Sequence, residues 1–362
     1  MKKTTTILGA VGMLMIIIAG CKKNSNDTVP TYDIPTTYNF TNVNYADAKT
    51  RLGMVTEMVN LMKNATKGPI DAQKLKDMFS NANSPFATAG YNASGIQVKD
   101  QCFALLQTDV LRFIDSLTKV SQSAVPASRG VAGVGASSAN PATKYALTAA
   151  GVNYQQVFSK TIMGGLVAYQ IANNYMVNGV SASVDNTTVV AGSGTAMEHN
   201  WDLAFGYWGV PNDFPTNKTG VALWGSYSTQ VDSGYHVNKI LMDAFLKGRA
   251  AISHKDTKTT QAQAAIIMQA FERIVGAAAL QEVKEVKESL SDNIARNSRL
   301  SECYGFIYSL KYNPKKKITD AQIDAILSLF PKNFYDLTLD QLNAIRDAVA
   351  KQYDFDAVKD IL

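Results

Sequence analysis

The chain has 362 residues, of which 46% are hydrophobic and 18% are charged, a balance typical of an ordinary globular protein. This composition excludes collagen-like and wholly disordered chains, and the length allows a core that needs neither disulfides nor structural metal. Lys and Arg total 35 against 30 Asp and Glu, and the resulting net charge of +5 is too small to indicate nucleic acid as a partner. With only three cysteines and three histidines, the sequence excludes cysteine-rich zinc modules and most multi-histidine metal sites.

The first residues have the pattern of a bacterial lipoprotein signal. A short basic start precedes an apolar run over residues 7–18, which is shorter than the ~20 residues that a membrane span requires. The run ends in two small residues followed by Cys21, an order that lets a signal peptidase cleave once the thiol carries a diacylglycerol. We therefore predict a signal peptide over residues 1–20 and lipidation of Cys21, whose acyl chains anchor the mature protein in a membrane.

Residues 21–39 are predicted to form a lipidated tether. They are rich in Asn, Ser, Asp and Thr and contain Pro30 and Pro35, a composition typical of linkers. Lys22, and not an acidic residue, follows the cysteine, which indicates sorting to the outer membrane. The membrane is thus the first expected partner, on either its periplasmic or its cell-surface face.

Beyond the tether, apolar side chains recur at helical spacing over five segments, 52–62, 103–117, 158–169, 267–278 and 300–310. Residues 257–288 favour one continuous helix, because helix-forming residues dominate them. Three further helix starts carry capping residues, namely Asp71 and the pairs Thr319 with Gln322 and Thr338 with Gln341. We predict a mostly α fold over residues 40–362, built as one helical bundle or as two packed bundles from the halves 40–178 and 195–362.

Three stretches lack the helical pattern. Residues 123–152 and 179–194 are rich in small residues and glycine, which favours mobile loops. Residues 209–235 contain several aromatic residues and are expected to form a packed loop that covers part of the core. Cys102 and Cys303 lie in helical stretches, and the sequence leaves open whether they pair or act as small buried hydrophobic residues.

The centre of the chain carries the strongest chemical signal. His199 and Asp202 are three residues apart in a predicted helix and so share one face, with Glu198 and Trp201 beside them and Trp208 further along. An imidazole with a carboxylate is a common start of a divalent-metal site, or of a general base with its orienting acid. The alternative is a hydrogen-bonded pair that orders a polar layer between helices.

Glu302 is a second candidate, because it lies in an otherwise apolar helix and a buried carboxylate needs a partner. It could meet His199 or Arg249 across a bundle, or lie on the exposed side of its helix. The predicted metal ligands are therefore His199, Asp202, Glu198 and Glu302, with a divalent metal or iron as the expected ion. No signature of a serine hydrolase, a phosphate-binding loop, a dinucleotide fold or a zinc peptidase is present in the sequence.

These segments resemble a known family. The pattern Glu198-His199-x-x-Asp202, followed by Phe-Gly-Tyr-Trp-Gly over 205–209, is similar to an uncharacterised family of bacterial lipoproteins, the domain of unknown function 4856. Further similar segments are 38–40, 244–252 with Arg249, and 300–307 with Glu302. The resemblance extends from about residue 34 to the C-terminus, and the family name implies no activity.

More distantly, the central segment is similar to imelysin-like proteins, which have a histidine, two spacers and a glutamate on an all-helical fold of two bundles. His199 takes the place of the histidine and Asp202 that of the glutamate, while Met197 stands where that family has glycine. The resemblance implies an accessory protein for metal or iron uptake that works with an outer-membrane receptor. The alternatives are a structural or protein-interaction lipoprotein without a catalytic or metal site, and a metallopeptidase-like hydrolase, whose further ligands the sequence does not supply.

Overall fold

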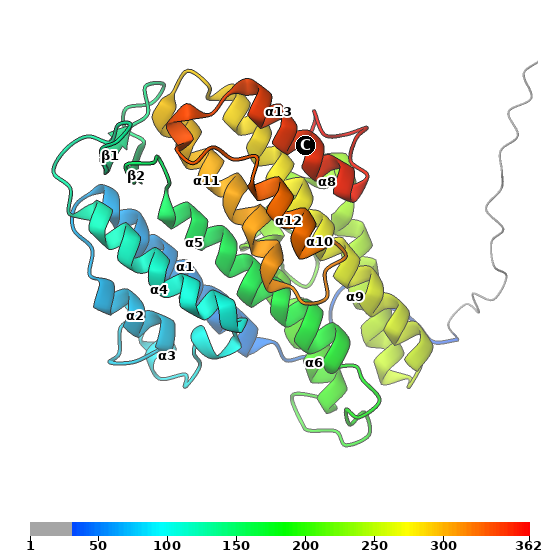
Figure 1. The fold of residues 1–362 in the computed structure, drawn as a ribbon. Helices are drawn as coiled ribbons and strands as arrows, with labels where there is room; N and C mark the ends of the chain where they lie inside the picture. Colours follow the sequence, from blue (N-terminus) through cyan, green and yellow to red (C-terminus); the bar gives the residue numbers. More distant parts are fainter. Residues whose placement is uncertain (1–30) are drawn as a thin grey trace, which may run out of the picture. The chain divides into compact units, whose positions relative to one another are not determined.

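The computed structural model describes residues 31–362, so the predicted signal peptide, Cys21 and most of the predicted tether lie outside the described residues. Residues 34–362 form one compact unit. Within the described part, the chain contains thirteen α-helices and one two-stranded sheet (Figure 1), which confirms the mostly α prediction.

The first half of the unit contains α1 (Ala46–Lys63), α2 (Ala72–Ser80), α3 (Ala89–Asn92), α4 (Ala104–Ser121) and α5 (Tyr154–Ile162). Helix α5 continues as π-helical turns over Met163–Ala168 and Gln170–Asn178. The second half contains α6 (Ala196–Trp208), α7 (Trp224–Gln230), α8 (Asp232–Tyr235), α9 (Val237–Ser253), α10 (Thr257–Glu288), α11 (Asn293–Ser309), α12 (Asp320–Leu327) and α13 (Leu339–Tyr353).

The long helices run side by side. Helices α1 and α4 pack against one side of α5, and α11 packs against α5 and α10 (Figure 1). Helix α6 contacts α1, α9 and the π-helical extension of α5, so elements on both sides of the 179–194 loop share one core. The predicted halves therefore belong to a single packed unit, and the loop between them does not divide it.

Helix α10 is continuous over 32 residues, as its composition predicts. Among the described residues it is the one helix that is long and apolar enough to cross a membrane. However, 72% of its apolar stretch is buried inside the fold, and the core helix of a globular protein has the same length and composition. This finding is therefore weak evidence for a membrane span.

The predicted helix starts are confirmed. The Asp71 carboxylate accepts hydrogen bonds from the backbone N–H groups of Gln73 and Lys74 at the start of α2. Thr319 with Gln322 and Thr338 with Gln341 form reciprocal capping boxes at α12 and α13. Each box satisfies backbone N–H groups that the first helical turn leaves without partners.

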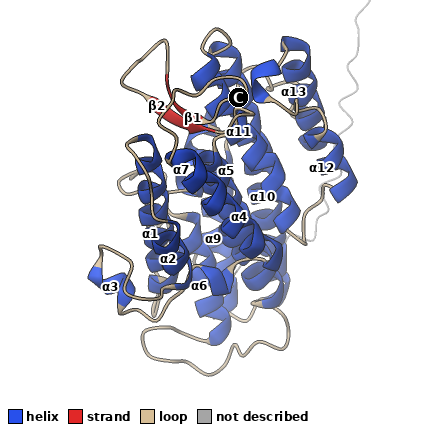
Figure 2. Cartoon of the chain, turned by 60° about the vertical axis from the view of Figure 1, so that its left-hand side comes forward, coloured by secondary structure: helices blue, strands red, loops and turns tan. Residues whose placement is uncertain are grey.

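The glycine-rich stretch 123–152 differs from the predicted mobile loop. It contains an antiparallel hairpin in which β1 (Gly133–Ala136) pairs with β2 (Lys144–Leu147) (Figure 2). A Cβ at Gly135 would lie 2.5 Å from the Ile294 side chain, so the glycine permits close packing of the hairpin against α11. Small residues here permit close packing of the hairpin, and composition alone does not distinguish this role from mobility.

The structure also shows the arrangement of the remaining segments and the positions of the cysteines. Residues 209–235 are packed, as predicted, and they include the short helices α7 and α8. Trp224 is fully buried and its indole N–H donates to the carbonyl of Met163. Cys102 and Cys303 are both buried and free. The packed unit begins before the predicted boundary at residue 40, because Tyr38 is only 1% exposed.

Candidate functional site

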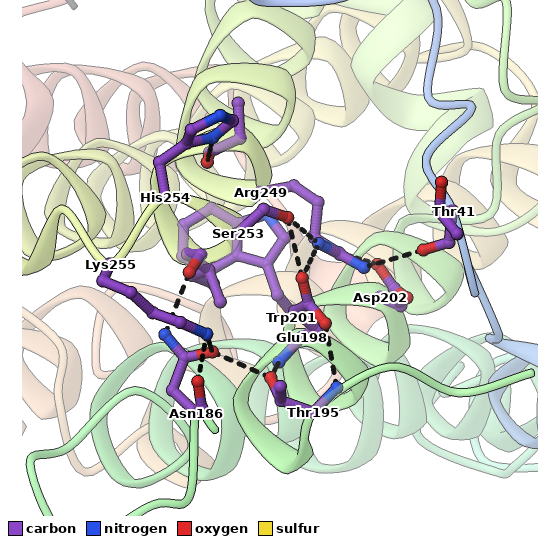
Figure 3. A network of polar contacts seen from close by, with 12 residues as sticks. Thr41, Asn186, Thr195, Glu198, Trp201, Asp202, Arg249, Ser253, His254 and Lys255 are labelled. Atoms are coloured by element: carbon purple, nitrogen blue, oxygen red, sulfur yellow. Dashed lines mark hydrogen bonds and ion pairs between the residues drawn. The ribbon is translucent and has the colours of Figure 1, made fainter. Parts of the chain in front are cut away.

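Arg249 is the centre of the site. Its side chain projects from α9, is fully buried, and lies between two carboxylates of α6 (Figure 3). The Nη1 atom is 2.7 Å from Oε1 of Glu198, and the Nε atom is 2.9 Å from Oδ1 of Asp202. Because these carboxylates are four residues apart on one helix, they lie one turn apart and a single guanidinium reaches both.

Close approach of α6 and α9 makes this pairing possible. A Cβ at Gly248 would lie 2.0 Å from the indole ring of Trp201, so only glycine fits at this crossing without a shift. The Trp201 indole N–H donates to the carbonyl of Phe245, 3.0 Å away. Both Trp201 and Trp208 are fully buried, and Trp208 donates to the hydroxyl of Ser228. The two tryptophans therefore belong to the core that holds the site.

Both carboxylates make further hydrogen bonds. Asp202 accepts from the Tyr38 hydroxyl at 2.8 Å and from the backbone N–H of Asn44 at 3.2 Å. Glu198 accepts from the backbone N–H of Thr195 at 2.8 Å and from the Ser253 hydroxyl at 2.7 Å. Thr195 and Glu198 also form a capping box at the start of α6, where the helix dipole favours negative charge.

The two carboxylates differ in their protonation equilibria. Burial raises the pKa of Asp202 above its ordinary value, and the nearby Arg249 charge and the Tyr38 hydroxyl oppose this effect only in part. Burial also acts to raise the pKa of Glu198, but the hydrogen bonds from Thr195 and Ser253, together with Arg249, outweigh it and lower the pKa. Burial and the neighbouring Asp202 raise the pKa of Tyr38, so its hydroxyl remains a hydrogen-bond donor.

The N-terminal segment of the packed unit is fixed on this cluster. Arg249 donates to the Thr41 carbonyl at 3.4 Å, and its guanidinium lies 5.2 Å from the centre of the Phe40 ring. The Tyr38 ring stacks on Phe205, with ring centres 3.7 Å apart. Three segments that carry the family resemblance therefore meet at one buried group. They are residues 38–40, the centre of α6 and the helix with Arg249.

The predicted metal ligands do not gather into one site. Glu198 and Asp202 lie together but are bonded to Arg249, while Glu302 pairs with a different cation. His199 has a buried Nδ1 atom that makes no hydrogen bond with the described residues, and no bond joins it to Asp202. Over residues 31–362 no group of three or more His, Cys, Asp or Glu side chains is placed to hold a metal ion.

Glu302 forms the second buried ion pair. Its carboxylate lies 2.9 Å from Nζ of Lys160, which comes from α5 and is only 5% exposed. The Lys160 ammonium also lies 5.1 Å from the centre of the Tyr227 ring and 5.6 Å from that of Phe306. Burial acts to lower the pKa of Lys160, but the charge of Glu302 outweighs it and raises the pKa, so the ammonium stays charged.

Glu282 of α10 adjoins this pair. Burial, together with the negative charge of Glu302, raises the pKa of Glu282 well above its ordinary value. Glu282 therefore favours its neutral, protonated form, in which it can donate to the neighbouring carboxylate. The buried Oε2 atom of Glu282 accepts no hydrogen bond from the described residues. A charged carboxylate would need such a donor, so this finding is consistent with the neutral form.

The sequence contains signals for two partners that our predictions did not include, Lys160 and Thr195. Lys160 is the one charged residue in the helical stretch 154–178, a signal similar to the one that singled out Glu302. Thr195 and Glu198 have capping-box spacing, which assigns Glu198 a helix-terminal role. Tyr38 had no such signal, because a tyrosine next to a polar linker does not reveal that it is buried.

The fold and the site define a helical protein whose chemistry-bearing motif is a buried arginine–carboxylate cluster. The family model described as Domain of unknown function (DUF4856) matches residues 35–356, and the chain belongs to this family. No curated protein and no solved structure matches the chain significantly. None of these comparisons shows the distant similarity to imelysin-like proteins.

Replacement of Arg249 tests the energetic role of the cluster. We expect Arg249→Met to lower the free energy of unfolding by about 3–5 kcal/mol, because it leaves two buried carboxylates without their cation. The loss should be largest near pH 7 and shrink toward pH 4. Without Arg249 the folded-state pKa of Asp202 rises further, so protonation stabilises the folded variant as the pH falls through that pKa.

Urea unfolding of the wild type and the variant across this pH range measures the effect. Arg129→Met is the matched control, since Arg129 forms an exposed pair with Asp336 and its loss should change stability little. Equal effects of the two substitutions, or a loss for Arg249→Met that does not depend on pH, would contradict the assigned role of the cluster.

The Lys160 cluster predicts opposite results for its two glutamates. Glu302→Gln should destabilise the fold by about 3 kcal/mol, because it leaves the Lys160 ammonium buried without a counter-charge. Glu282→Gln should not destabilise the fold at neutral pH and should raise its stability above that of the wild type, since the amide stays neutral whereas the wild-type carboxyl must take up a proton on folding. A folded-state pKa that is raised contributes stability below the unfolded pKa, and this contribution is lost as the pH rises through the folded pKa.

The wild type should therefore lose stability over a pH range in which Glu282→Gln does not. Unfolding curves of the three proteins between pH 4 and 9 measure this difference. Strong destabilisation by Glu282→Gln at neutral pH would show that the carboxylate is charged and essential to the pair.

Proposed function

We propose that this chain is a lipid-anchored, non-enzymatic binding protein of the bacterial outer membrane, held there by acylated Cys21. One observation carries the proposal: Glu198 and Asp202 are both bonded to Arg249, so neither carboxylate is available for catalysis or metal binding in this arrangement. The same guanidinium and Asp202 also hold residues 38–44, the segment that follows the predicted tether. The sequence motif of the family thus serves to attach the anchoring segment to the helical body.

The lipid anchor is inferred from the sequence alone. A basic start, a short apolar run, two small residues and Cys21 have the order of a lipoprotein signal. Acyl chains on this cysteine would provide stable anchoring, since each buried methylene contributes about 0.8 kcal/mol. The Arg249 cluster complements such an anchor, because it converts the end of a polar linker into a fixed attachment.

The geometry supports catalysis less well. A general-base histidine needs an orienting acid within hydrogen-bond reach, about 2.6–3.2 Å. In this structure the partners of Asp202 are Tyr38, Asn44 and Arg249, and His199 is not among them. A metallopeptidase-like site would also need three protein ligands around one ion, and Glu198 and Asp202 would have to leave Arg249 to provide them.

Metal or iron binding in an uptake complex is a second candidate, and one observation favours it. The buried Nδ1 atom of His199 has no partner among the described residues, so it is available as a ligand. Glu198 and Asp202 would have to leave Arg249 to complete such a site. Elemental analysis of the purified full-length protein after loading with iron and zinc, beside His199→Ala, separates the candidates: stoichiometric metal that the variant loses would favour uptake over our main proposal.

The anchor is tested by Cys21→Ser. We expect this variant to lose labelling by a clickable palmitate analogue, because no other acylation site is predicted. Without acyl chains it should also leave the outer-membrane fraction. Cys102→Ser is the matched control, since that thiol is buried and should not affect labelling. Unchanged labelling and membrane association of Cys21→Ser would overturn the proposed anchor.

Limited proteolysis tests the attachment of the N-terminal segment. In the wild type we expect cleavage in the tether to stop before Ile34, because residues 38–44 are bonded to the cluster. Arg249→Met should expose sites up to Ala46, where α1 begins. N-terminal sequencing of the resistant fragments gives the boundary, and Arg129→Met should retain that of the wild type. Identical boundaries in all three proteins would contradict the attachment role.

A further inference from the structure

A small cavity lined by aromatic rings lies away from the Arg249 cluster. It has a volume of about 250 Å³ and lies where α4, α5, α11 and the segment after α12 meet. Its aromatic lining consists of Phe113, Tyr154, Tyr304, Tyr308, Phe330 and Phe334. We propose that this aromatic cavity binds a small molecule that carries one aromatic ring and one carboxylate. The inference deepens the proposed binding function by naming a site and a ligand class.

The walls of the cavity are held in fixed orientations. Tyr304 and Tyr308 stack with ring centres 5.8 Å apart and an interplanar angle of 13°. Phe330 meets Tyr304 edge-on at 5.4 Å, while Phe113 and Tyr154 stack at 5.7 Å across the cavity lining. Aromatic rings attract one another in offset-stacked or edge-on arrangements, so a flat ring that enters the cavity finds both kinds of surface.

The volume limits the ligand to a single ring. An apolar cavity of about 150 Å³ accommodates benzene. The 250 Å³ of this cavity therefore allows one ring with a short substituent. Ligand pockets for larger molecules usually have volumes of about 300–1,000 Å³, so a multi-ring cofactor does not fit here without rearrangement.

The charges around the cavity select an anion. Arg112 and Lys332 line it, and the lining includes no carboxylate. The nearby Asp109 accepts from Arg112 at 2.7 Å and also from the hydroxyls of Tyr308 and Tyr312, so its charge is already compensated. An aromatic cage alone would also suit a cationic ligand, but the ammonium of Lys332, which has no carboxylate partner among the described residues, opposes that choice.

Three polar groups of the lining remain available to a ligand. Lys332 is exposed and forms no ion pair with the part of the chain that is described. The hydroxyls of Tyr154 and Tyr304 make no hydrogen bond within residues 31–362, and burial raises the pKa of Tyr304, which keeps its hydroxyl protonated as a donor. A carboxylate at the mouth of the cavity can therefore meet the ammonium and a hydroxyl, while the ring occupies the apolar interior.

Calorimetry and saturation-transfer NMR on the full-length protein test the assignment. The probes are benzoate, 4-hydroxybenzoate and phenylacetate, with benzyl alcohol as the neutral analogue and phenyltrimethylammonium as the cation. We expect saturable binding of at least one aromatic acid, tenfold or more tighter than benzyl alcohol, and no saturable binding of the cation. Absence of binding by all three acids, or preference for the cation, would overturn the proposal.

Paired variants locate the site. Leu327→Trp should abolish binding because Leu327 lines the cavity, whereas Leu329→Trp should not, since Leu329 is also half-buried but lies outside the lining. Lys332→Met should weaken binding of the acid about fivefold or more and leave benzyl alcohol unaffected. Lys315→Met is its control, because Lys315 is exposed and remote from the lining.

Equal effects of a variant and its control would show that the ligand binds elsewhere and overturn the assignment. The result is independent of the anchor: purified Cys21→Ser should bind the same acid with the same affinity. Membrane association that persists in Cys21→Ser contradicts the proposed anchor alone, whereas absence of aromatic-acid binding contradicts the cavity assignment alone.

Discussion

A fully buried guanidinium is the constraint on which the centre of this fold depends. Arg249 stays charged, and removing it from water is costly unless carboxylates and hydrogen-bond acceptors surround it. The packed unit meets this requirement with Glu198 and Asp202 from one helix face and with the Thr41 carbonyl from the N-terminal segment. The cluster therefore requires the close approach of α6 and α9 that Gly248 permits, and it fixes where the chain enters its own core.

The same physical requirement recurs at Lys160 with a different charge balance. At Arg249 two carboxylates face one cation, and backbone and hydroxyl donors compensate the excess negative charge. At Lys160 the raised pKa of Glu282 favours a neutral carboxyl group, which reduces the negative charge instead. Motifs that resemble metal ligands in the sequence thus act as partners of buried cations, because a carboxylate in a helical core needs a positive or donating neighbour of any kind.

Much of the fold follows from local patterns, whereas the partners within the site do not. Helical periodicity and capping residues predicted the long helices and the starts at Asp71, Thr319 and Thr338, since these signals act within one or two turns. The sequence also singled out Glu198 and Asp202 of α6 and Glu302 of α11 as polar groups that need partners. These local signals could not show that Arg249 bonds to Asp202 or that Lys160 bonds to Glu302, because helix packing decides those contacts across long sequence separations. The hairpin was missed because short strands rich in glycine lack an alternating pattern.

The bond between Tyr38 and Asp202 spans 164 residues, and Arg249 lies further along the chain. During synthesis the N-terminal segment emerges first, yet the groups that hold it appear only after more than half of the protein has been made. The centre of the fold must therefore remain incomplete until late in translation. The contacts that fix the N-terminal segment therefore form only once α9 has been made.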